Sequence, residues 1–232
     1  MSAFTERLLD LLYPPKCAFC RKVVRDRRML CPACEKKLPA PEKDLQGQQI
    51  SHLAVCLSPL YYTEDVRQSL LRYKFHGAAA YCRIYAELMD ACLREHGVKA
   101  DIVTWVPLSR KRLRRRGYDQ ARLLAEEVAG RQGIVCEQML VKPKNNPAQS
   151  GRKNAEERRR NVEGVYRAVT SCTGEHVLLV DDIVTTGATL SSAAEELLRI
   201  GAGKVTGLTL ARAMPGKATR TESNGDKGNA DI

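Results

Sequence analysis

The feature that most constrains the fold is the stretch "VLLVDDIVTTGATL", residues 177–190. A short apolar run ends at two adjacent acids, Asp181 and Asp182, and a Thr/Gly cluster follows at once, before a helical pattern begins. Continuous apolar runs of this length are typical of strands in parallel sheets that are covered on both faces. Ligands of such sheets bind at the carboxyl ends of the strands, so we expect the acids and the cluster to lie at a ligand-binding edge.

Strand-like and helical patterns alternate along most of the chain, and the apolar fraction of 44% is that of a globular protein. The strand-like stretches are residues 52–62, 101–107, 177–181 and 204–213, and the helical stretches are residues 64–77, 81–97, 118–133 and 190–202. This alternation predicts an α/β fold, a mostly parallel sheet flanked by helices.

Three regions are expected. Residues 1–45 would hold an N-terminal helix, apolar on one face at 4–12, and a small cysteine-bearing module. A polar, patternless linker at 38–49 would lead into the main domain at 46–213. Residues 214–232 are rich in Gly, Asn, Lys and Asp, which predicts a disordered polar tail.

Two C-x-x-C pairs, "CAFC" and "CPAC", supply Cys17, Cys20, Cys31 and Cys34. Four thiolates on two short turns suit tetrahedral Zn²⁺, and a closed shell of this kind indicates a structural metal. Two disulfides or an iron–sulfur cluster are the alternatives. The spacing matches no common ferredoxin pattern, and no export signal precedes the cysteines. Arg21 stands where a zinc knuckle often has Gly. The other five cysteines show no ligand spacing and are expected to be small core residues.

The turn "TTGAT" comprises Thr185, Thr186, Gly187, Ala188 and Thr189. Unpaired backbone N–H groups at the start of a helix, with Gly permitting close approach, form a cradle for an anion such as phosphate. Adjacent carboxylates would repel that phosphate unless they bind sugar hydroxyls or a ligand-held Mg²⁺, so the combination suggests a sugar phosphate. The alternative is an ordinary helix N-cap by Thr185 or Thr186.

The formal net charge of +11 points to an anionic partner. One basic run follows the predicted strand at 101–107, and a second covers 147–166. A solvated surface would explain single cations, but two runs beside one predicted cleft exceed what a small ligand needs. Single-stranded DNA could use the remainder, although aromatic residues are only 5% of the chain. The expected cleft or nucleic-acid contacts are Arg112, Arg114, Arg115, Arg116, Gln120 and Arg158, and the nearest aromatic residues are Trp105, Tyr118 and Tyr166.

The stretch at 177–190 resembles the phosphoribosyl-pyrophosphate (PRPP) motif of type I phosphoribosyltransferases. The resemblance implies that Asp181 and Asp182 hold the ribose 2- and 3-hydroxyls and that Thr185 to Thr189 hold the 5-phosphate. Type I enzymes place a pyrophosphate loop after their first core strand, and Mg²⁺ accompanies the PRPP. The matching residues here are Val106, Pro107, Leu108 and Ser109.

The paired C-x-x-C, "VPLSRKRLRRRGYDQA", "RRRNVEGVY" and the PRPP motif together resemble the ComF family of competence and DNA-utilisation proteins. The resemblance covers nearly everything from Cys17 to Ala211 and implies a type I phosphoribosyltransferase fold with one zinc. Asp119 is a departure, because the family usually has Asn in its R-G-[FY]-N-Q element. No apolar run approaches the roughly 18 residues of a membrane span, so we expect a cytoplasmic protein that is not an integral membrane protein.

Three functions fit these features. The preferred one is a competence or DNA-utilisation factor that handles incoming single-stranded DNA during natural transformation, with other DNA-uptake or recombination proteins as further partners. The alternatives are a metabolic, amidophosphoribosyltransferase-like enzyme that transfers ribose 5-phosphate from PRPP to a nitrogen nucleophile, and a PRPP-sensing regulator. Whether the chain is an enzyme stays open, and no catalytic residue is assigned. An autonomous amidotransferase is disfavoured because the chain begins Met-Ser and lacks an N-terminal Cys nucleophile.

Overall fold

The protein is built around one largely parallel sheet. The structure is a computed structural model that describes residues 14–24, 28–75, 78–143 and 165–214. Along the sheet the strand order is β1-β2-β9-β8-β4-β5, and β3 also pairs with β9. All pairings in this sheet are parallel except that of β1 with β2. The strands are β1 (Gly47–Gln48), β2 (Cys56–Leu57), β3 (Leu60–Tyr61), β4 (Ile102–Trp105), β5 (Val135–Cys136), β8 (His176–Val184) and β9 (Lys204–Arg212).

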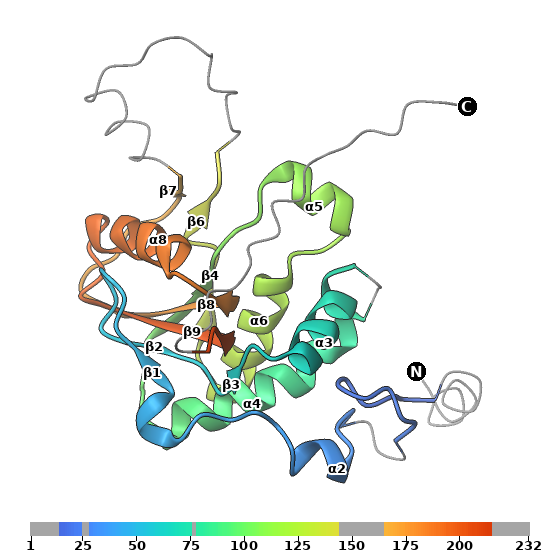
Figure 1. Ribbon diagram of the computed structural model, residues 1–232. Helices are drawn as coiled ribbons and strands as arrows, with labels where there is room; N and C mark the ends of the chain where they lie inside the picture. Colours follow the sequence, from blue (N-terminus) through green and yellow to red (C-terminus); the bar gives the residue numbers. More distant parts are fainter. Residues whose placement is uncertain (1–13, 25–27, 76–77, 144–164, 215–232) are drawn as a thin grey trace, which may run out of the picture.

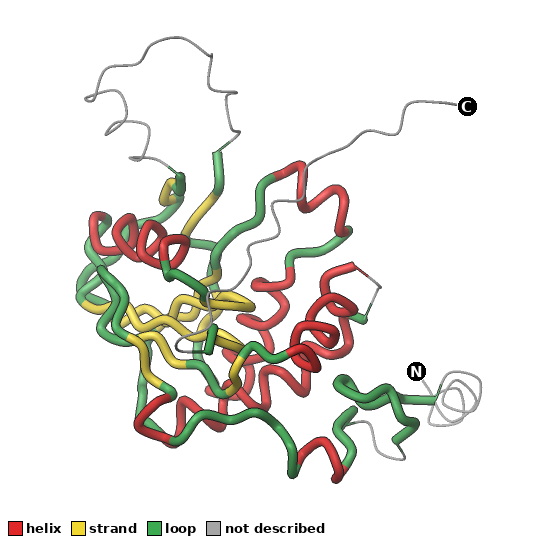
Figure 2. Tube along the Cα trace, viewed as in Figure 1, coloured by secondary structure: helices red, strands yellow, loops and turns green. Residues whose placement is uncertain are grey.

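Helices cover both faces of the sheet (Figures 1 and 2). On one face lie α3 (Glu64–Phe75), α4 (Cys82–Glu95) and α6 (Gln120–Gln132), and on the other lies α8 (Ala188–Arg199). Alternate residues of β8 serve the two faces, because Leu178 and Val180 join the apolar cluster of α3, α4 and α6, whereas Val177 and Leu179 join that of α8. The predicted α/β sheet, covered on both faces, is therefore confirmed.

Two stretches near the start of the main domain differ from expectation. The predicted strand at 52–62 is split into β2 and β3 around Ser58 and Pro59, and proline has no N–H to offer a neighbouring strand. The predicted linker at 38–49 contains a 3-10 helix, η1 (Lys43–Leu45), as well as β1. Arg212 of β9 holds this segment in a regular structure, because its Nη1 donates hydrogen bonds to the carbonyl oxygens of Leu45 and Gly47 at 2.6 and 3.1 Å.

The first basic run forms a helix, α5 (Arg110–Arg116), which no periodic apolar pattern announces. The Oγ atom of Ser109 accepts a hydrogen bond from the Arg112 amide at 3.4 Å, and Gly117, with φ of 81°, ends the helix. Arginine favours helices intrinsically, so a capped run of this composition is helical without an apolar stripe. A small antiparallel pair, β6 (Leu140–Val141) with β7 (Arg167–Ala168), lies beside α8 (Figure 1).

The cysteine-bearing segment, residues 17–34, packs on the α3 and α4 side of the body. Cys17, Ala18 and Phe19 are buried in the same apolar cluster as those helices, and the ring centroids of Phe19 and Tyr85 are 6.2 Å apart. Two short helices complete this side of the molecule. The helix α2 (Pro32–Glu35) lies at the second C-x-x-C pair, and the 3-10 helix η2 (Ala79–Tyr81) lies between α3 and α4.

Some expectations fall outside the described residues. They are the N-terminal helix at 4–12, most of the second basic run, including Arg158, and the tail beyond residue 214. Within the described part of the chain, no helix has both the length and the apolar character needed to cross a membrane.

Candidate functional site

The two C-x-x-C turns come together as one four-cysteine group. The Sγ atoms of Cys17, Cys20, Cys31 and Cys34 all lie within 4.8 Å of one another, and the Cys20 and Cys31 sulfurs are 3.6 Å apart. Zinc–sulfur bonds of about 2.3 Å in a tetrahedron require sulfurs just under 4 Å apart, so the group fits a four-thiolate zinc. The chain thus has an N-terminal zinc-binding cluster.

Backbone geometry supports the first turn. Arg21, at the position where a knuckle often has Gly, adopts φ of 63°, in the left-handed region that favours glycine. Its amide donates to the Cys17 carbonyl oxygen at 2.9 Å. Of the remaining cysteines, Cys136 is partly exposed and the others are buried, as expected for small core residues: Cys56, Cys82, Cys92 and Cys172.

A second site lies at the carboxyl end of the sheet. Asp181 and Asp182 lie near the end of β8, and the loop that follows β4 faces them across a cleft of about 160 Å³. The cleft gathers most of the residues expected there from the sequence: Val106, Pro107, Leu108, Ser109, Arg112, Arg116, Gln120, Asp181, Asp182 and Thr189. These residues come from two separate parts of the chain, 106–120 and 181–189.

The two acids have different surroundings. Asp182 is buried, and its Oδ2 lies 2.7 Å from Nζ of Lys74, whose side chain is 17% exposed. The Oδ1 atom of Asp181 accepts a hydrogen bond from the Asp182 amide at 2.8 Å. Burial, followed by the charge of Asp182, raises the pKa of Asp181 to about 8. The raised pKa of Asp181 lowers the negative charge of its carboxyl group at neutral pH, which favours contact with hydroxyl groups of a ligand.

Lys74 is a cleft residue that sequence reasoning missed. It lies in the last turn of α3 and reads in the sequence as one more polar position of an amphipathic helix. Lys142, just after β6, and Tyr166 also line the cleft, with the Lys142 Nζ 4.9 Å from the centre of the Tyr166 ring. Tyr166 was expected near the cleft. No local signal distinguishes either lysine from a surface residue.

The "TTGAT" turn leads from β8 into α8 and borders its own small hollow of about 30 Å³. Gly187 has φ of 78°, and a Cβ there would lie 2.7 Å from the Ile50 side chain, so only glycine fits. Thr185, Thr186, Ala188 and Thr189 are exposed. Gly187 is the N-cap and offers no side-chain cap, while Thr186 Oγ1 accepts a hydrogen bond from the Ala188 amide at 3.4 Å. The turn thus presents hydroxyls and backbone N–H groups to solvent at a helix start.

Asp119 holds the loop after β4 in place. Its Oδ2 accepts a hydrogen bond from the Leu108 amide at 3.1 Å, and its Oδ1 caps α6 through the Arg122 amide at 3.3 Å. Burial raises the pKa of Asp119, and both amide bonds oppose that shift. Asp119 does not line the cleft, so its contacts are to the backbone around the cleft.

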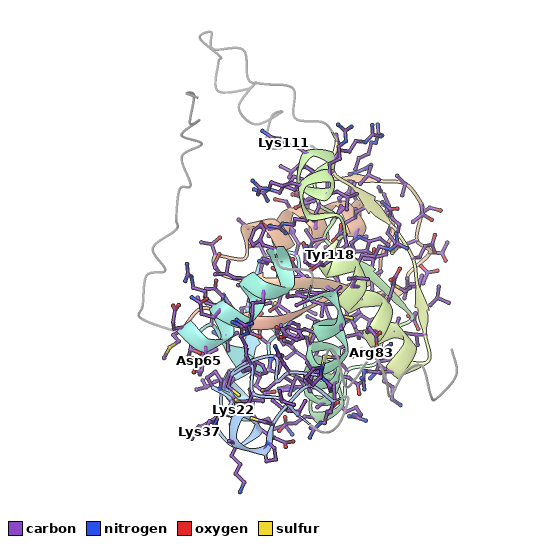
Figure 3. The ribbon with its side chains drawn as sticks, turned by 90° about the vertical axis from the view of Figure 1, so that its right-hand side faces the viewer. Lys22, Lys37, Asp65, Arg83, Lys111 and Tyr118 are labelled. Atoms are coloured by element: carbon purple, nitrogen blue, oxygen red, sulfur yellow. The ribbon has the colours of Figure 1, made fainter. Side chains whose placement is uncertain are left out.

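The arginines of α5 divide into two groups. Arg112 and Arg116 line the cleft, and Arg116 Nη1 donates to Oε1 of the buried Gln120 at 2.6 Å. Arg114 and Arg115 are exposed and do not line the cleft. Figure 3 shows this side of the molecule, with α5 and Lys111 at the top, Tyr118 beneath, and Lys22 of the four-cysteine segment at the bottom.

Three consecutive residues of α3 bind three separate regions. Nη2 of Arg72 donates to the carbonyl oxygens of Ala18 and Phe19, inside the first C-x-x-C turn, at 2.8 and 2.9 Å. The Tyr73 hydroxyl donates to the carbonyl oxygen of Gln120, at the start of α6, at 2.8 Å. Lys74 pairs with the acid motif of β8. This turn of α3 therefore connects the four-cysteine group with the cleft.

Two family models match parts of this chain. A family model for the phosphoribosyl transferase domain matches residues 115–226, and one for the double zinc ribbon domain matches residues 8–45. The latter segment contains four cysteines, which is one metal-binding set. The chain is 31% identical to the DNA utilization protein YhgH of Salmonella typhimurium, over 82% of this chain and 86% of the relative.

Competence proteins show similar identities over similar lengths. The match with competence protein ComFC of Bacillus subtilis is 30% identical and covers 90% of this chain and 89% of the relative. The match with competence protein F of Haemophilus influenzae is 28% identical and covers 86% and 85%. Among solved structures, the allosteric regulatory enzyme of purine biosynthesis overlaps 55% of this chain and 25% of its own at 24% identity, with a TM-score of 0.42. That overlap is too low to add to these matches.

Proposed function

Since the chain belongs to the ComF family of competence and DNA-utilisation proteins, we propose that it binds PRPP in the cleft and handles single-stranded DNA in the cytoplasm during natural transformation. The observation that carries the PRPP assignment is the convergence on one cleft of the acid pair, the loop after β4 and the cations Lys74, Arg112 and Arg116. An anion with hydroxyl groups matches that set of side chains.

In this proposal the cleft and the neighbouring "TTGAT" turn hold different parts of PRPP. The carboxylates of Asp181 and Asp182 accept hydrogen bonds from the ribose 2- and 3-hydroxyls. The backbone N–H groups and hydroxyls of residues 185–189 hold the 5-phosphate at the start of α8. The loop at 106–109, with Arg112 and Arg116 beside it, holds the pyrophosphate together with Mg²⁺.

Calorimetry tests the PRPP assignment. We expect Asp181→Asn with Asp182→Asn to lower PRPP affinity by at least about 100-fold, because both carboxyl groups that accept hydrogen bonds from the ribose hydroxyls are lost. Asp44→Asn, an exposed carboxylate at the opposite edge of the sheet, is the matched control and should leave affinity unchanged. Unchanged affinity in the double variant would remove the acid pair from the binding site.

The DNA component rests on family membership and on the cations that a small ligand does not need. We expect replacement of Arg114, Arg115 and Arg116 by Gln to weaken binding of single-stranded DNA and to flatten its dependence on salt concentration. The measurement is fluorescence anisotropy of a labelled oligonucleotide at several salt concentrations. If the unaltered protein binds no DNA at low salt, direct DNA contact must be abandoned.

Two further experiments address the role of the cleft in the cell and its chemistry. A deletion strain complemented with the acid-pair variant should lose natural transformation if PRPP binding is required. The metabolic alternative predicts release of pyrophosphate, as a nitrogen nucleophile forms a bond to C1 of PRPP and the bond from C1 to the pyrophosphate oxygen breaks. Pyrophosphate release with candidate nucleophiles, compared with release from PRPP alone, distinguishes an enzyme from a PRPP sensor.

A further inference from the structure

An exposed aromatic ring lies where α3 meets the arginines of α5. Phe75 follows Lys74 at the end of α3 and is 48% exposed, the one exposed Phe, Tyr or Trp among the described residues. The three aromatic residues expected near the cleft are less exposed than Phe75. Trp105 and Tyr166 are buried, and the partly buried Tyr118 donates its hydroxyl hydrogen bond to the Tyr73 carbonyl oxygen.

Two arginine side chains already lie over the ring. The Cζ atom of Arg116 lies 5.0 Å from the centre of the Phe75 ring, and that of Arg115 lies 6.0 Å from it. Arg116, which lies over the ring, lines the cleft, and so does Lys74, the residue before Phe75. The ring therefore lies beside the entrance to the cleft. An aromatic face with guanidinium groups beside it is a combination that proteins use to stack nucleobases.

The charge around the ring identifies the kind of ligand. None of the six cations of α5 forms an ion pair with an acid in the part of the chain that the structure describes. A strand of nucleic acid offers a partner to each of these groups, because its phosphates can pair with the cations and its flat bases can stack on the ring. Bases of a duplex are already stacked on their neighbours, so the ring requires an unpaired base.

We propose that Phe75, together with Arg115 and Arg116, forms a stacking site for one unpaired base of single-stranded DNA at the entrance to the cleft. The proposal rests on the proposed function and extends it, because it names the contact that reads bases as well as phosphates. It places a nucleotide of the strand directly beside the PRPP pocket. Neighbouring phosphates then lie along α5.

The test is a cycle of two protein forms and two oligonucleotides, measured by fluorescence anisotropy. One oligonucleotide is an oligo-dT and the other has the same length with abasic residues, which retain the phosphates and lack the bases. Phe75→Leu keeps an apolar side chain and removes the aromatic face. We expect it to weaken oligo-dT binding by about 5- to 100-fold, the range of base stacking on aromatic side chains, and to leave abasic binding unchanged.

Salt dependence separates the ring from the arginines. Phe75→Leu removes no charge, so the slope of affinity against salt concentration should stay the same, whereas the arginine variants reduce it. Phe75→Trp should restore affinity, and its fluorescence should be quenched by oligo-dT against the background of the single buried Trp105. Leu113→Ala is the matched control, since Leu113 is an exposed apolar residue of α5 without an aromatic face.

Four results would overturn the stacking site. Equal weakening of oligo-dT and abasic binding by Phe75→Leu would reduce Phe75 to a general apolar contact. No weakening at all, with DNA binding intact in the unaltered protein, removes the stacking site and leaves the proposed function standing. Binding of phosphatidylserine vesicles that depends on Phe75, without Phe75-dependent DNA binding, would assign the patch to a membrane surface. Absence of DNA binding in the unaltered protein would end both the stacking site and the direct DNA contact of the proposed function, and would leave the PRPP assignment standing.

Discussion

The two sites of this protein are assembled in opposite ways. The four-cysteine group takes all its ligands from residues 17–34, on two turns of identical spacing. The cleft takes its lining from α3, α5, α6, the loop after β4, β8 and the start of α8. A site built from one short segment can be recognised from its sequence alone, whereas a site built from the whole fold shows only its most regular part there.

The comparison also concerns energetics. A segment as short as residues 17–34 has little apolar core of its own, so its order depends on the metal and on the helices it packs against. The cleft lies on a sheet whose strands are buried on both faces. The apolar core of the sheet therefore holds the cleft residues in place without a bound ligand. The predictions below measure how independent the two regions are, from the largest expected effect to the smallest.

Cys31→Ser should have the largest effect, because it removes one of four thiolates that hold the segment together. We expect zinc content, measured by atomic absorption, to fall from one ion per chain to nearly none, and the melting temperature to fall by about 10 °C or more. Cys136→Ser is the control, a partly exposed cysteine outside the group that should change neither. Retention of zinc by Cys31→Ser would contradict the four-thiolate site.

Lys74→Met should have the next largest effect, and on the cleft alone. It leaves Asp182 buried without its cation, which should lower the free energy of unfolding by about 1–3 kcal/mol and PRPP affinity by about 10-fold. Urea denaturation and calorimetry measure the two quantities. Lys99→Met, an exposed lysine at the opposite edge, is the control. Full zinc content in Lys74→Met would show that damage to the cleft does not spread to the cysteines.

Arg72→Met tests whether a change at the four-cysteine group weakens PRPP binding in the cleft. Arg72 does not line the cleft, yet it fastens α3 to the first C-x-x-C turn. We expect its loss to weaken PRPP binding by about 5-fold, equivalent to ~1 kcal/mol, by loosening the turn that carries Lys74. The same substitution in a Lys74→Met background should then have no further effect. An equal effect in both backgrounds would mean that Arg72 acts by another route.

Asp119→Asn should have the smallest effect. Asparagine, the usual residue of the family at this position, has one carbonyl oxygen, so it can keep only one of the amide bonds to Leu108 and Arg122. We expect a loss of about 1 kcal/mol in the free energy of unfolding, measured by urea denaturation, with PRPP affinity nearly unchanged. A large loss of PRPP affinity would indicate that Asp119 contacts the ligand itself.

Much of this architecture follows from the sequence for a physical reason. Buried strands such as β8 and β9 are long apolar runs, and C-x-x-C spacing reflects the reach of one short turn. The acid pair and "TTGAT" form one continuous stretch, so their chemistry is visible before folding. Lys74 and Lys142 could not be foreseen, because only the crossing of α3 and the β6 and β7 pair over the sheet brings them to the acids. The helical form of α5 was hidden by its lack of an apolar stripe.

The turn of α3 formed by Arg72, Tyr73 and Lys74 has a consequence in terms of thermodynamic linkage. If this turn transmits order from the zinc cluster to the PRPP site, the coupling free energy is the same in both directions. Whatever factor zinc adds to PRPP affinity, PRPP adds to zinc affinity. At equilibrium, a chelator should therefore be needed at a higher concentration to remove zinc from protein saturated with PRPP, and metal retention becomes a report on the occupancy of the cleft.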